Sequence, residues 1–322
     1  MFRYIIKRLL QMIPLLIIIS LITFGISKLA PGDYLSVHMA DPSWSAARIA
    51  AERHRLGLDQ PIFMQYLIWA GNFVRGNMGD SFRYSAPVSS LIGQRLLATL
   101  SLGVSSLLFT WLVAIPLGIY ASVRKYTTTD KAFSLLTFTA LGIPDFFLAL
   151  MLLFLSVKTG LLPAGGMTGV GHDQMSWLGQ ALDIAHHMIL PTIAVSIGTV
   201  AIYQRRMRGN LLDVLAEDYI RMARAKGLPE NKVIYKHALR NAINPMVTLL
   251  GYDLAALLSG FALVENVIGW PGLGNMMLEA LQAMDMPLAM AGMMIGALML
   301  LLGNLVADLL LAMVDPRIQL EA

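Results

Sequence analysis

The chain has 322 residues, of which 57% are hydrophobic and 14% are charged, and its formal net charge is +4 at pH 7. Soluble globular domains carry about 25% charged residues, so the composition excludes an ordinary soluble protein and predicts an integral membrane protein. The sequence has no cysteine, which excludes disulfides and thiolate metal sites. It also lacks the G-x-x-x-x-G-K-[ST], H-E-x-x-H and G-x-S-x-G motifs, so it carries no recognisable energy-coupling or hydrolytic chemistry of its own.

Six segments are apolar enough to cross a hydrocarbon core of about 30 Å, which takes about 20 helical residues. We expect helices, because these runs lack the two-residue alternation of a membrane β-barrel strand. In chain order, the predicted spans are 9–28, 96–123, 132–157, 187–203, 245–264 and 288–314. The predicted fold class is therefore an all-α integral membrane protein with six transmembrane helices.

Basic residues near the ends of the predicted spans gather on one side, which the positive-inside rule assigns to the cytoplasm. They form three clusters: Arg3, Lys7 and Arg8; Arg124, Lys125 and Lys131; and Arg205, Arg206 and Arg208. The loop 265–287 on the other side has no Lys or Arg but contains Glu265, Glu279 and Asp285. We therefore expect both termini to be cytoplasmic. The first span is expected to be retained, because it is long for a signal peptide and no small-residue cleavage site follows it.

The segment 31–95, between the first two predicted spans, is expected to be extracytoplasmic and is long for a connector. An apolar stripe at helical spacing is formed by Ile62, Phe63, Tyr66, Trp69, Ala70 and Phe73. We interpret the stripe as one face of a helix that packs on the membrane surface or on the protein itself. A docking platform for another protein is the alternative, and the polar edges at Gln65 and Asn72 suit that role.

The segment 204–245, after the fourth predicted span, is the most informative part of the chain because it is long and highly charged. Apolar residues recur there at helical spacing from 211 to 226: Leu211, Leu212, Leu215, Tyr219, Met222 and Ala223. Acidic side chains precede basic ones along this predicted helix, an order that suits the helix dipole. Glu217 and Arg221 form a favourable i, i+4 pair.

Gly227 is suited to end this helix with a positive φ, and Pro229 to sit in the first turn of a second helix over about 230–242. The sequence therefore predicts a knuckle of two short helices that projects from the membrane. So polar a feature in so apolar a chain favours a partner outside the membrane. A solvated hairpin without a partner is the alternative.

The sequence of this loop, MARAKGLPENKVIYKHALRNAINP, resembles the EAA loop of binding-protein-dependent ABC importer permeases, in the dipeptide, oligopeptide and nickel group. Further motifs of that group follow in the expected order: Pro31-Gly32-Asp33, Leu56 to Pro61 with Gln65-Tyr66, Gly79-Asp80-Ser81, His187 to Pro191, Trp270 to Gly274, and Asp315-Pro316-Arg317. Aligned on Gly227, the Glu-Ala-Ala that names the loop falls on Arg221, Met222 and Ala223, and the later Leu-Pro becomes Leu239-Arg240. The missing glutamate weakens any claim that a Glu contacts an ATPase here.

The resemblance implies a type I ABC importer permease fold with six transmembrane helices, in the bacterial cytoplasmic (inner) membrane. Residues 1–30 would form the N-terminus and first helix, 31–95 the extracytoplasmic segment, and 96–322 the core with a coupling loop at 204–245. The implied partners in the lipid bilayer and beside it are a second, unlike permease in a heterodimer, two cytoplasmic ATPase subunits and an extracytoplasmic substrate-binding protein. ATP and Mg would lie on the ATPases, so this chain is expected to be non-catalytic and to bind no cofactor, metal or nucleic acid.

In proteins of this group the knuckle is expected to insert into a groove on the ATPase. Ala223 and Gly227 would allow close approach, and Arg221, Arg224 and Lys226 would pair with acidic groove residues. Closure of the ATPases on ATP would then switch the side to which the pore opens. Among cargoes the resemblance favours di- or oligopeptides, and nickel or metallophores and oligosaccharides are the alternatives.

Three aspartates fall inside predicted spans, where ionisable groups are costly and are functional candidates by default. Asp308, with Asn304, matches a pattern of the resembling group, and we interpret it as structural. Asp145, directly after the helix-bending Pro144, and Asp253 are candidate residues of a substrate pathway that would attract a peptide's amino terminus. Hydrogen bonding between helices is the alternative for both.

A cluster outside the membrane suggests metal ligation: His172, Asp173, Asp183, His186 and His187. Adjacent histidines on a helix point about 100° apart and do not easily share one ion, and His187 already belongs to the resembling motif. The turn from Trp270 to Gly274 is expected to be a re-entrant or pore-edge feature, with a plain loop as the alternative.

Two other classes explain the sequence less well. A secondary transporter would need broken helices in related halves, and the chain shows no such internal repeat. A membrane enzyme would need converging catalytic side chains, for which Asp145 and Asp253 are the only candidate pair, and both lack the adjacent glycine that is usual in aspartyl proteases.

Overall fold

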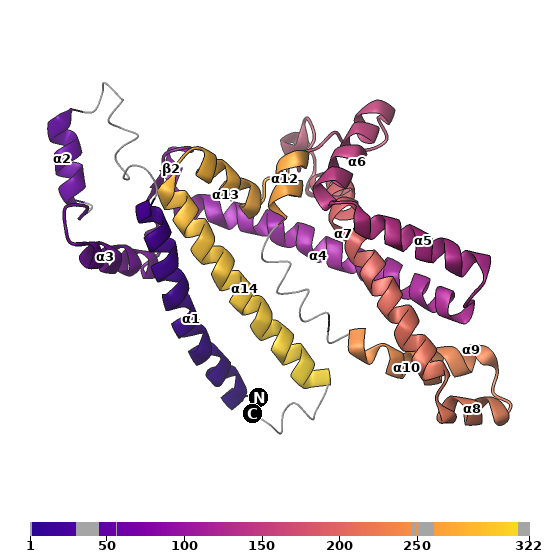
Figure 1. Cartoon of the computed structure of the whole chain (residues 1–322). Coiled ribbons are helices and arrows are strands. Elements are labelled where there is room, and N and C mark those ends of the chain that lie inside the picture. The colour runs from indigo at the N-terminus through magenta and orange to yellow at the C-terminus, as the bar shows by residue number, and fades with distance from the viewer. Residues whose placement is uncertain (1, 30–44, 56, 247–248, 250–260, 315–322) are drawn as a thin grey trace.

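The computed structural model describes residues 2–29, 45–55, 57–246, 249 and 261–314 (Figure 1). The helices before the midpoint of the chain are α1 (Phe2–Leu29), α2 (Ala46–Arg55), α3 (Ile62–Val74), α4 (Val88–Val123), α5 (Thr128–Gly142) and α6 (Asp145–Thr159). After them come the 3-10 turn η2 (His172–Gln174), α7 (Trp177–Leu215), α8 (Asp218–Ala225), α9 (Glu230–Lys232), the π-helical segment η3 (Val233–Ala238), α10 (Leu239–Ala242), α12 (Ala262–Ile268), α13 (Leu273–Gln282) and α14 (Met286–Val314). A short antiparallel hairpin, β1 (Asp80–Ser81) with β2 (Ala86–Pro87), is the one departure from the predicted all-α class among the described residues.

Four helices are long and apolar enough to cross a membrane, namely α1, α4, α7 and α14. The predicted third span, 132–157, is not one straight helix, because α5 and α6 meet at a bend of 103°. Pro144 stands at the bend as the N-cap residue of α6, and Ile143 before it is extended, as the ring of a following proline requires. The predicted fifth span, 245–264, lies mostly outside the described residues, so the count of six remains a prediction.

Helices α4 and α7 form the central pair of the molecule. Their seam is lined by small α4 residues at every fourth position, all of them buried: Ser106, Thr110, Ala114, Gly118 and Ser122. A Cβ on Gly118 would lie 2.6 Å from Cβ of Met207, so only glycine allows this approach. Ser196 Oγ donates to Ser106 Oγ at 3.1 Å, and Ser105 and Thr192 share a bond of 2.8 Å. Close packing of small residues with interhelical hydrogen bonds is what holds helices together in lipid.

Helix α7 runs well past the predicted fourth span, 187–203. At 1.5 Å per residue its 39 residues extend about 58 Å, more than a bilayer core of about 30 Å needs. Ser176 caps its start by accepting from Gly179 N, and Pro191 is accommodated inside it. The helix is therefore longer than one bilayer crossing needs and continues without a break to α8.

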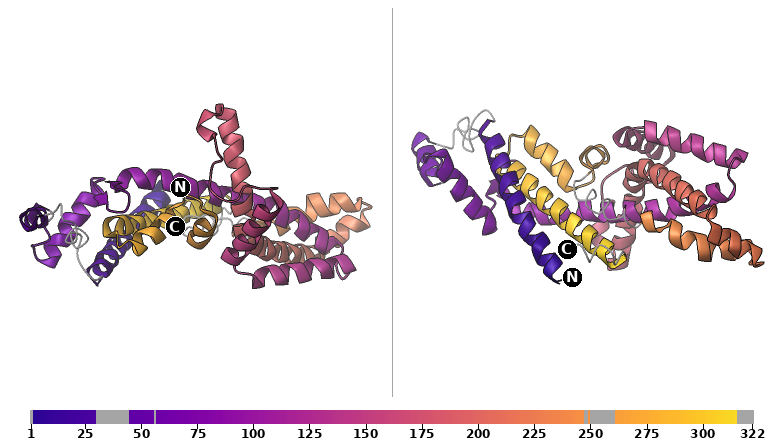
Figure 2. Two further views of the ribbon diagram at one scale, coloured as in Figure 1. Left: turned by 90° about the horizontal axis from the view of Figure 1, so that it is seen from above. Right: turned by 60° about the horizontal axis from the view of Figure 1, so that its bottom comes forward.

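Helices α1 and α14 lie side by side, as both views of Figure 2 and Figure 1 show. Arg8 Nε lies 3.2 Å from Asp308 Oδ2, which joins the start of α1 to the last third of α14. The ion pair confirms the structural role expected for Asp308.

Helix α3 packs against α1 through one face only. Tyr66 and Trp69 lie within ring-contact distance of Phe24, and Tyr66 Oη bonds Ser20 Oγ at 2.8 Å. In the first turn of α3, before this contact, Ile62 is 66% exposed and Phe63 is 71% exposed. Packing on the protein is thus confirmed for part of the predicted stripe, and the rest of it faces outward.

The start of α4, the β1–β2 hairpin, α12, α13 and the start of α14 form one packed unit, here called the hairpin end. Trp270 is fully buried and its Nε1 donates to Ala98 O at 2.9 Å. Glu265 is also fully buried, accepting from Thr99 Oγ1 at 2.7 Å and from Asn275 N at 2.9 Å in the first turn of α13. The turn 270–274 is therefore clamped onto α4, and its re-entrant or pore-edge role stays a prediction.

Asp285 closes the same unit from the side of α14. It is fully buried, its Oδ1 accepts from Leu288 N at 3.2 Å, and its Oδ2 accepts from Arg83 N at 3.0 Å and from Ser81 Oγ. The residue caps α14 and ties the hairpin to it at the same time. The acidic residues that mark this loop in the sequence are thus used inside the fold.

Candidate functional site

The knuckle, residues 217–242, gathers at the end of the molecule where α7 finishes (Figure 1). The predicted single helix over 211–226 is wrong, because the first part of it, up to Leu215, is the last turn of α7. Ala216 ends α7, and Glu217, in extended conformation with φ −68° and ψ 148°, begins α8. One apolar stripe in the sequence is therefore two helices that meet at an angle.

The corner of the knuckle has the geometry expected of Gly227. Its φ is 75°, its N donates to Arg224 O at 2.9 Å, and Leu228 N donates to Ala223 O. These two bonds make a Schellman motif, which satisfies the last carbonyls of α8. No atom lies within 4 Å of a Cβ built on Gly227. Within this chain, glycine is therefore required by the backbone angle and not by close packing.

The second arm of the knuckle starts at Glu230, directly after Pro229, and ends at Ala242, as predicted. Its middle, Val233–Ala238, is π-helical. Such segments are rare and occur often at functional sites.

Charged and polar side chains brace the two arms. Arg224 donates through Nη2 and Nε to the Glu230 carboxylate, at 2.7 and 3.2 Å, and Asn241 Nδ2 donates to Tyr219 Oη at 2.8 Å. The hydrogen bonds from Arg224 hold the pKa of Glu230 below its ordinary value. Arg221 pairs with Asp218 at 3.2 Å instead of with the predicted Glu217.

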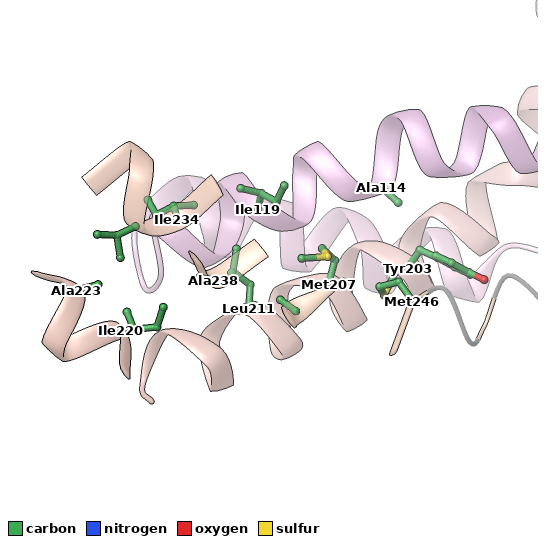
Figure 3. Packing of buried hydrophobic residues seen from close by; sticks show 12 residues of the cluster. Ala114, Ile119, Tyr203, Met207, Leu211, Ile220, Ala223, Ile234, Ala238 and Met246 are labelled. Atoms are coloured by element: carbon green, nitrogen blue, oxygen red, sulfur yellow. The ribbon is translucent and has the colours of Figure 1, made fainter. Parts of the chain in front are cut away.

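The inner face of the knuckle is packed onto the ends of α4 and α7 (Figure 3). Ile220 of α8 and Val233 and Ala238 of η3 are fully buried, together with Met207 and Leu211 of α7. Ala114 and Ile119 of α4 belong to the same cluster. Because such an interior is close-packed, a displacement of the knuckle is passed to both long helices.

The outer face of the knuckle combines basic and apolar groups. The Arg221 side chain is 70% exposed, Met222 is 60% exposed and Tyr235 is 59% exposed, and Lys226 is exposed beside them. The predicted stripe placed Met222 inward, which is wrong, and Tyr235 was not singled out. The inward residues of α8 are Ile220 and Ala223, three positions apart, a spacing that identifies the buried face once the start of α8 is known.

The five residues predicted to couple to an ATPase fall into two groups. Arg221, Lys226 and Gly227 lie on exposed parts of the knuckle. Ala223 is only 8% exposed and packs within the cluster, and Arg224 is engaged by Glu230. Ala223 is therefore part of the interior of the knuckle, and Arg224 braces its two arms at the surface.

A hollow of about 240 Å³ lies between the knuckle and the ends of α4 and α7. Its wall is formed by Ser122, Val123, Lys125, Leu212, Leu215, Ala216, Arg224, Glu230 and Ile234. The knuckle thus presents both a projecting face and a recess beside it.

Of the two candidate pathway residues, only Asp145 lies in the part of the chain that the structure describes. Asp145 is exposed as the first residue of α6, and a Cβ on Gly198 of α7 would lie 3.5 Å from its Oδ1. Asp253 lies outside the described residues. The two are therefore not brought together by anything the structure describes.

In the structure, Asp183 of the histidine cluster contacts both His172 and His187 and holds the segment before α7 in place. Asp183 accepts from Gly169 N at 2.9 Å and contacts His172 Nδ1 at 2.7 Å, and His187 Nδ1 lies 3.2 Å from its other oxygen. In the part of the chain that the structure describes, no group of three or more His, Cys, Asp or Glu side chains has the arrangement of a metal site. These bonds fasten the segment before α7 to α7 itself.

Comparison with known proteins gives matches along almost the whole chain. The family model described as "Binding-protein-dependent transport system inner membrane component" matches residues 114–320, and the model of the N-terminal part of such components matches residues 1–103. The chain is 40% identical over 318 residues to the oligopeptide transport system permease protein AppB of Bacillus subtilis (strain 168), covering 98% of this chain and 99% of the relative.

Two further relatives are matched over 99% of both chains. The dipeptide transport system permease protein DppB of Escherichia coli (strain K12) is 38% identical over 336 residues. The glutathione transport system permease protein GsiC of Salmonella typhi is 37% identical over 320 residues. The chain is a multi-pass membrane protein and belongs to the family of binding-protein-dependent transport system inner membrane components.

Proposed function

We propose that this chain is the permease subunit of an ATP-driven importer that takes up peptides delivered by an extracytoplasmic binding protein. The proposal includes six transmembrane helices in a type I importer fold, both termini in the cytoplasm and a coupling loop at 204–245. Two ATPase subunits and a second, unlike permease complete the complex, and the ATP and Mg are held by the ATPases.

The observation that carries the proposal is the packing of the knuckle. Its inner face shares one apolar cluster with the ends of α4 and α7, and its outer face offers exposed Arg221, Lys226 and Met222. A partner that seats on the outer face and changes shape would move both long helices as one body. This is the arrangement that alternating access driven from outside the membrane needs.

The outer face also suggests the chemistry of its partner. Arg221 and Lys226 would meet acidic groups in the ATPase groove, while Met222 and Tyr235 would enter apolar positions between them. Arg224 would act within the chain, because its bidentate bond to Glu230 sets the angle of the corner at Gly227. Ala223 would contribute by letting α8 approach η3.

Peptides are the proposed cargo because the relatives reported above are named as oligopeptide, dipeptide and glutathione transport system permeases. Among the described residues, Asp145 is the acidic group that we propose attracts a peptide's amino terminus. It stands at the bend between α5 and α6 and faces Gly198 of α7, which has no side chain to contact the carboxylate. Asp253 remains the second candidate.

The test is co-purification of the tagged chain expressed with its neighbouring genes. We expect an unlike permease and ATPases to be recovered, with ATP hydrolysis stimulated by a peptide-loaded binding protein. Arg221→Glu is expected to release the ATPases, whereas Arg75→Glu, the same charge change at the exposed C-cap of α3, is expected to leave them bound. Recovery of the wild-type chain without ATPases would overturn the proposal.

A further inference from the structure

A buried ion pair joins α5 to α7 beside the knuckle. Arg208 donates through Nε to Asp130 Oδ1 at 2.7 Å and through Nη2 to Oδ2 at 2.8 Å. The Asp130 side chain is only 4% exposed, and that of Arg208 is 25% exposed. A two-point bond between a planar guanidinium and a carboxylate fixes orientation as well as distance.

Asp130 also organises the turn between α4 and α5. Its Oδ2 accepts from Tyr126 N at 2.8 Å, and Thr127 Oγ1 accepts from Asp130 N. Tyr126 has a φ of 65°, in the left-handed region that is strained for a residue other than glycine and persists only where its surroundings hold it. One carboxylate therefore connects the end of α4, the start of α5 and α7.

The position of Arg208 on α7 links this pair to the knuckle. Met207 and Leu211, on either side of it in the sequence, belong to the cluster that packs against α8 and η3. A second contact lies one turn earlier on α7, where the Arg205 guanidinium is 4.5 Å from the centroid of the Phe138 ring of α5. Helix α5 is thus attached to α7 by its start and by its middle.

The far end of α5 is the bend at Pro144, after which Asp145 begins α6. Helix α5 therefore runs from the knuckle end of α7 to the place where the proposed pathway residue stands. A rigid helix fixed at its start passes a displacement to its other end.

We propose that Asp130 and Arg208 are positioning residues that carry the movement of the knuckle through α5 to the bend at Pro144 and Asp145. The inference rests on the proposed function of the knuckle as an ATPase contact. Without the pair, the start of α5 is no longer tied to α7 and α5 follows it less closely, so more ATP is hydrolysed for each opening of the pathway.

The first test measures trialanine transported per ATP hydrolysed by the complete complex in proteoliposomes. The variants Asp130→Asn and Arg208→Gln should each lower this ratio by about fivefold or more, while hydrolysis stays responsive to the loaded binding protein. The double variant should be no worse than either single one, because both remove the same link. Arg206→Gln is the matched control, since Arg206 is exposed two residues away and loses the same charge.

A second test uses the absence of natural cysteine, which makes single-cysteine reporters specific. Leu141→Cys reports near the bend, and Met222→Cys reports on the outer face of the knuckle. When ATPase closure is trapped with ATP and vanadate, the labelling rate at position 141 by a water-soluble maleimide should change in the wild type. That change should be lost with Asp130→Asn and reduced with Arg208→Lys, which retains the charge but cannot make the two-point bond. Position 222 should be protected by the ATPase in every variant.

The outcomes separate the two proposals. Lack of protection at position 222 in the wild-type complex would overturn the function proposed for the knuckle. Protection there, together with an unchanged transport ratio in Asp130→Asn or a reporter at 141 that still responds in that variant, would overturn the role of the ion pair alone. A parallel fall of hydrolysis and transport would also overturn it, since that is the result of a purely structural bond.

Discussion

At the knuckle end, Glu230 pairs with Arg224 in a bridge whose side chains are 54% and 41% exposed, whereas at the hairpin end Glu265 and Asp285 are fully buried. The buried acids accept hydrogen bonds from backbone N–H groups and hydroxyls, and they fasten helix starts in place. The exposed pair holds two surface arms at a fixed angle. Carboxylates thus build a fixed scaffold at one end, and at the other they shape a surface left open to a partner.

The comparison of the two ends also shows that the acidic residues of the loop 265–287 have a structural role. Its lack of Lys and Arg supports the predicted orientation of the chain. Glu265 and Asp285 are nevertheless withdrawn from the surface by the fold. The open charge that a protein partner would meet is found at the knuckle end, on Arg221 and Lys226.

The largest effect should come from removing a scaffold acid. Glu265→Ala leaves Asn275 N and Thr99 Oγ1 without their buried acceptor and opens a cavity, so we expect a loss of about 3 kcal/mol in stability. The measurement is the apparent melting temperature of the purified protein in detergent. Glu217→Gln, at an exposed position that makes no side-chain capping bond, should leave that temperature nearly unchanged. Equal melting temperatures for the two variants would remove the distinction between buried and exposed acids.

A smaller effect is expected for Gly227→Ala. A Cβ there meets no atom within 4 Å, but φ is 75°, so the change should cost about 1–2 kcal/mol in the folded knuckle. Gly209→Ala is the matched control, because its Cβ is equally unobstructed and the residue lies inside α7, where alanine stabilises a helix. Protease cleavage of the loop 226–229 should accelerate for the first variant only. If both variants resist cleavage equally, the backbone angle is not what requires glycine.

The outer face of the knuckle is tested by Met222→Gln. Glutamine keeps the helix propensity of methionine but is polar, so the loss of apolar burial against an ATPase should weaken binding by about fivefold. Stability of the isolated chain should not change, because Met222 is 60% exposed there. Titration of the ATPase by surface plasmon resonance measures the affinity, with Met222→Leu as the apolar control. A drop in the melting temperature of the chain would show that Met222 acts inside the fold.

The smallest effect is the pH dependence of the bridge between Arg224 and Glu230. The pKa of Glu230 is lowered in the folded chain, so its stabilisation is present above the ordinary value of 4.5 and is lost as pH falls through the folded value. Both side chains are more than a third exposed, so the difference should be only a few tenths of a kcal/mol. Melting temperatures of the wild type and Glu230→Gln should differ slightly at pH 7 and converge as the pH falls through the lowered pKa of Glu230 in the folded chain. A difference that grows on acidification would contradict the assignment.

Local features were predictable where the cause lies within a few residues. Gly227 and Pro229 define the corner, since a positive φ and a missing N–H act at those positions alone. The bend near Pro144 was predicted for the same reason, although the sequence did not indicate that it would reach 103°. The boundary between α7 and α8 was not predictable from periodicity, because Leu211 and Ala223 continue one apolar pattern across it.

The candidate site was predicted as a segment but only partly as a surface. Arg221, Lys226 and Gly227 lie at exposed positions, whereas Ala223 is buried and Arg224, although 41% exposed, is engaged by Glu230. Met222 and Tyr235 were missed as outward residues. The direction of each side chain depends on how α8 and η3 lie against α4 and α7, which no pattern within 217–242 specifies.

The amino-acid sequence by itself determined the membrane class, the apolar central parts of α1, α4, α7 and α14, and the corner at Gly227, because hydropathy and backbone angles act locally along the chain. The bond between Asp130 and Arg208, the burial of Glu265 beside Thr99 and the inward face of α8 arise only in the folded molecule. Each depends on residues far apart in the sequence being brought together, and the energy of such a contact exists only once both partners have been removed from solvent and lipid.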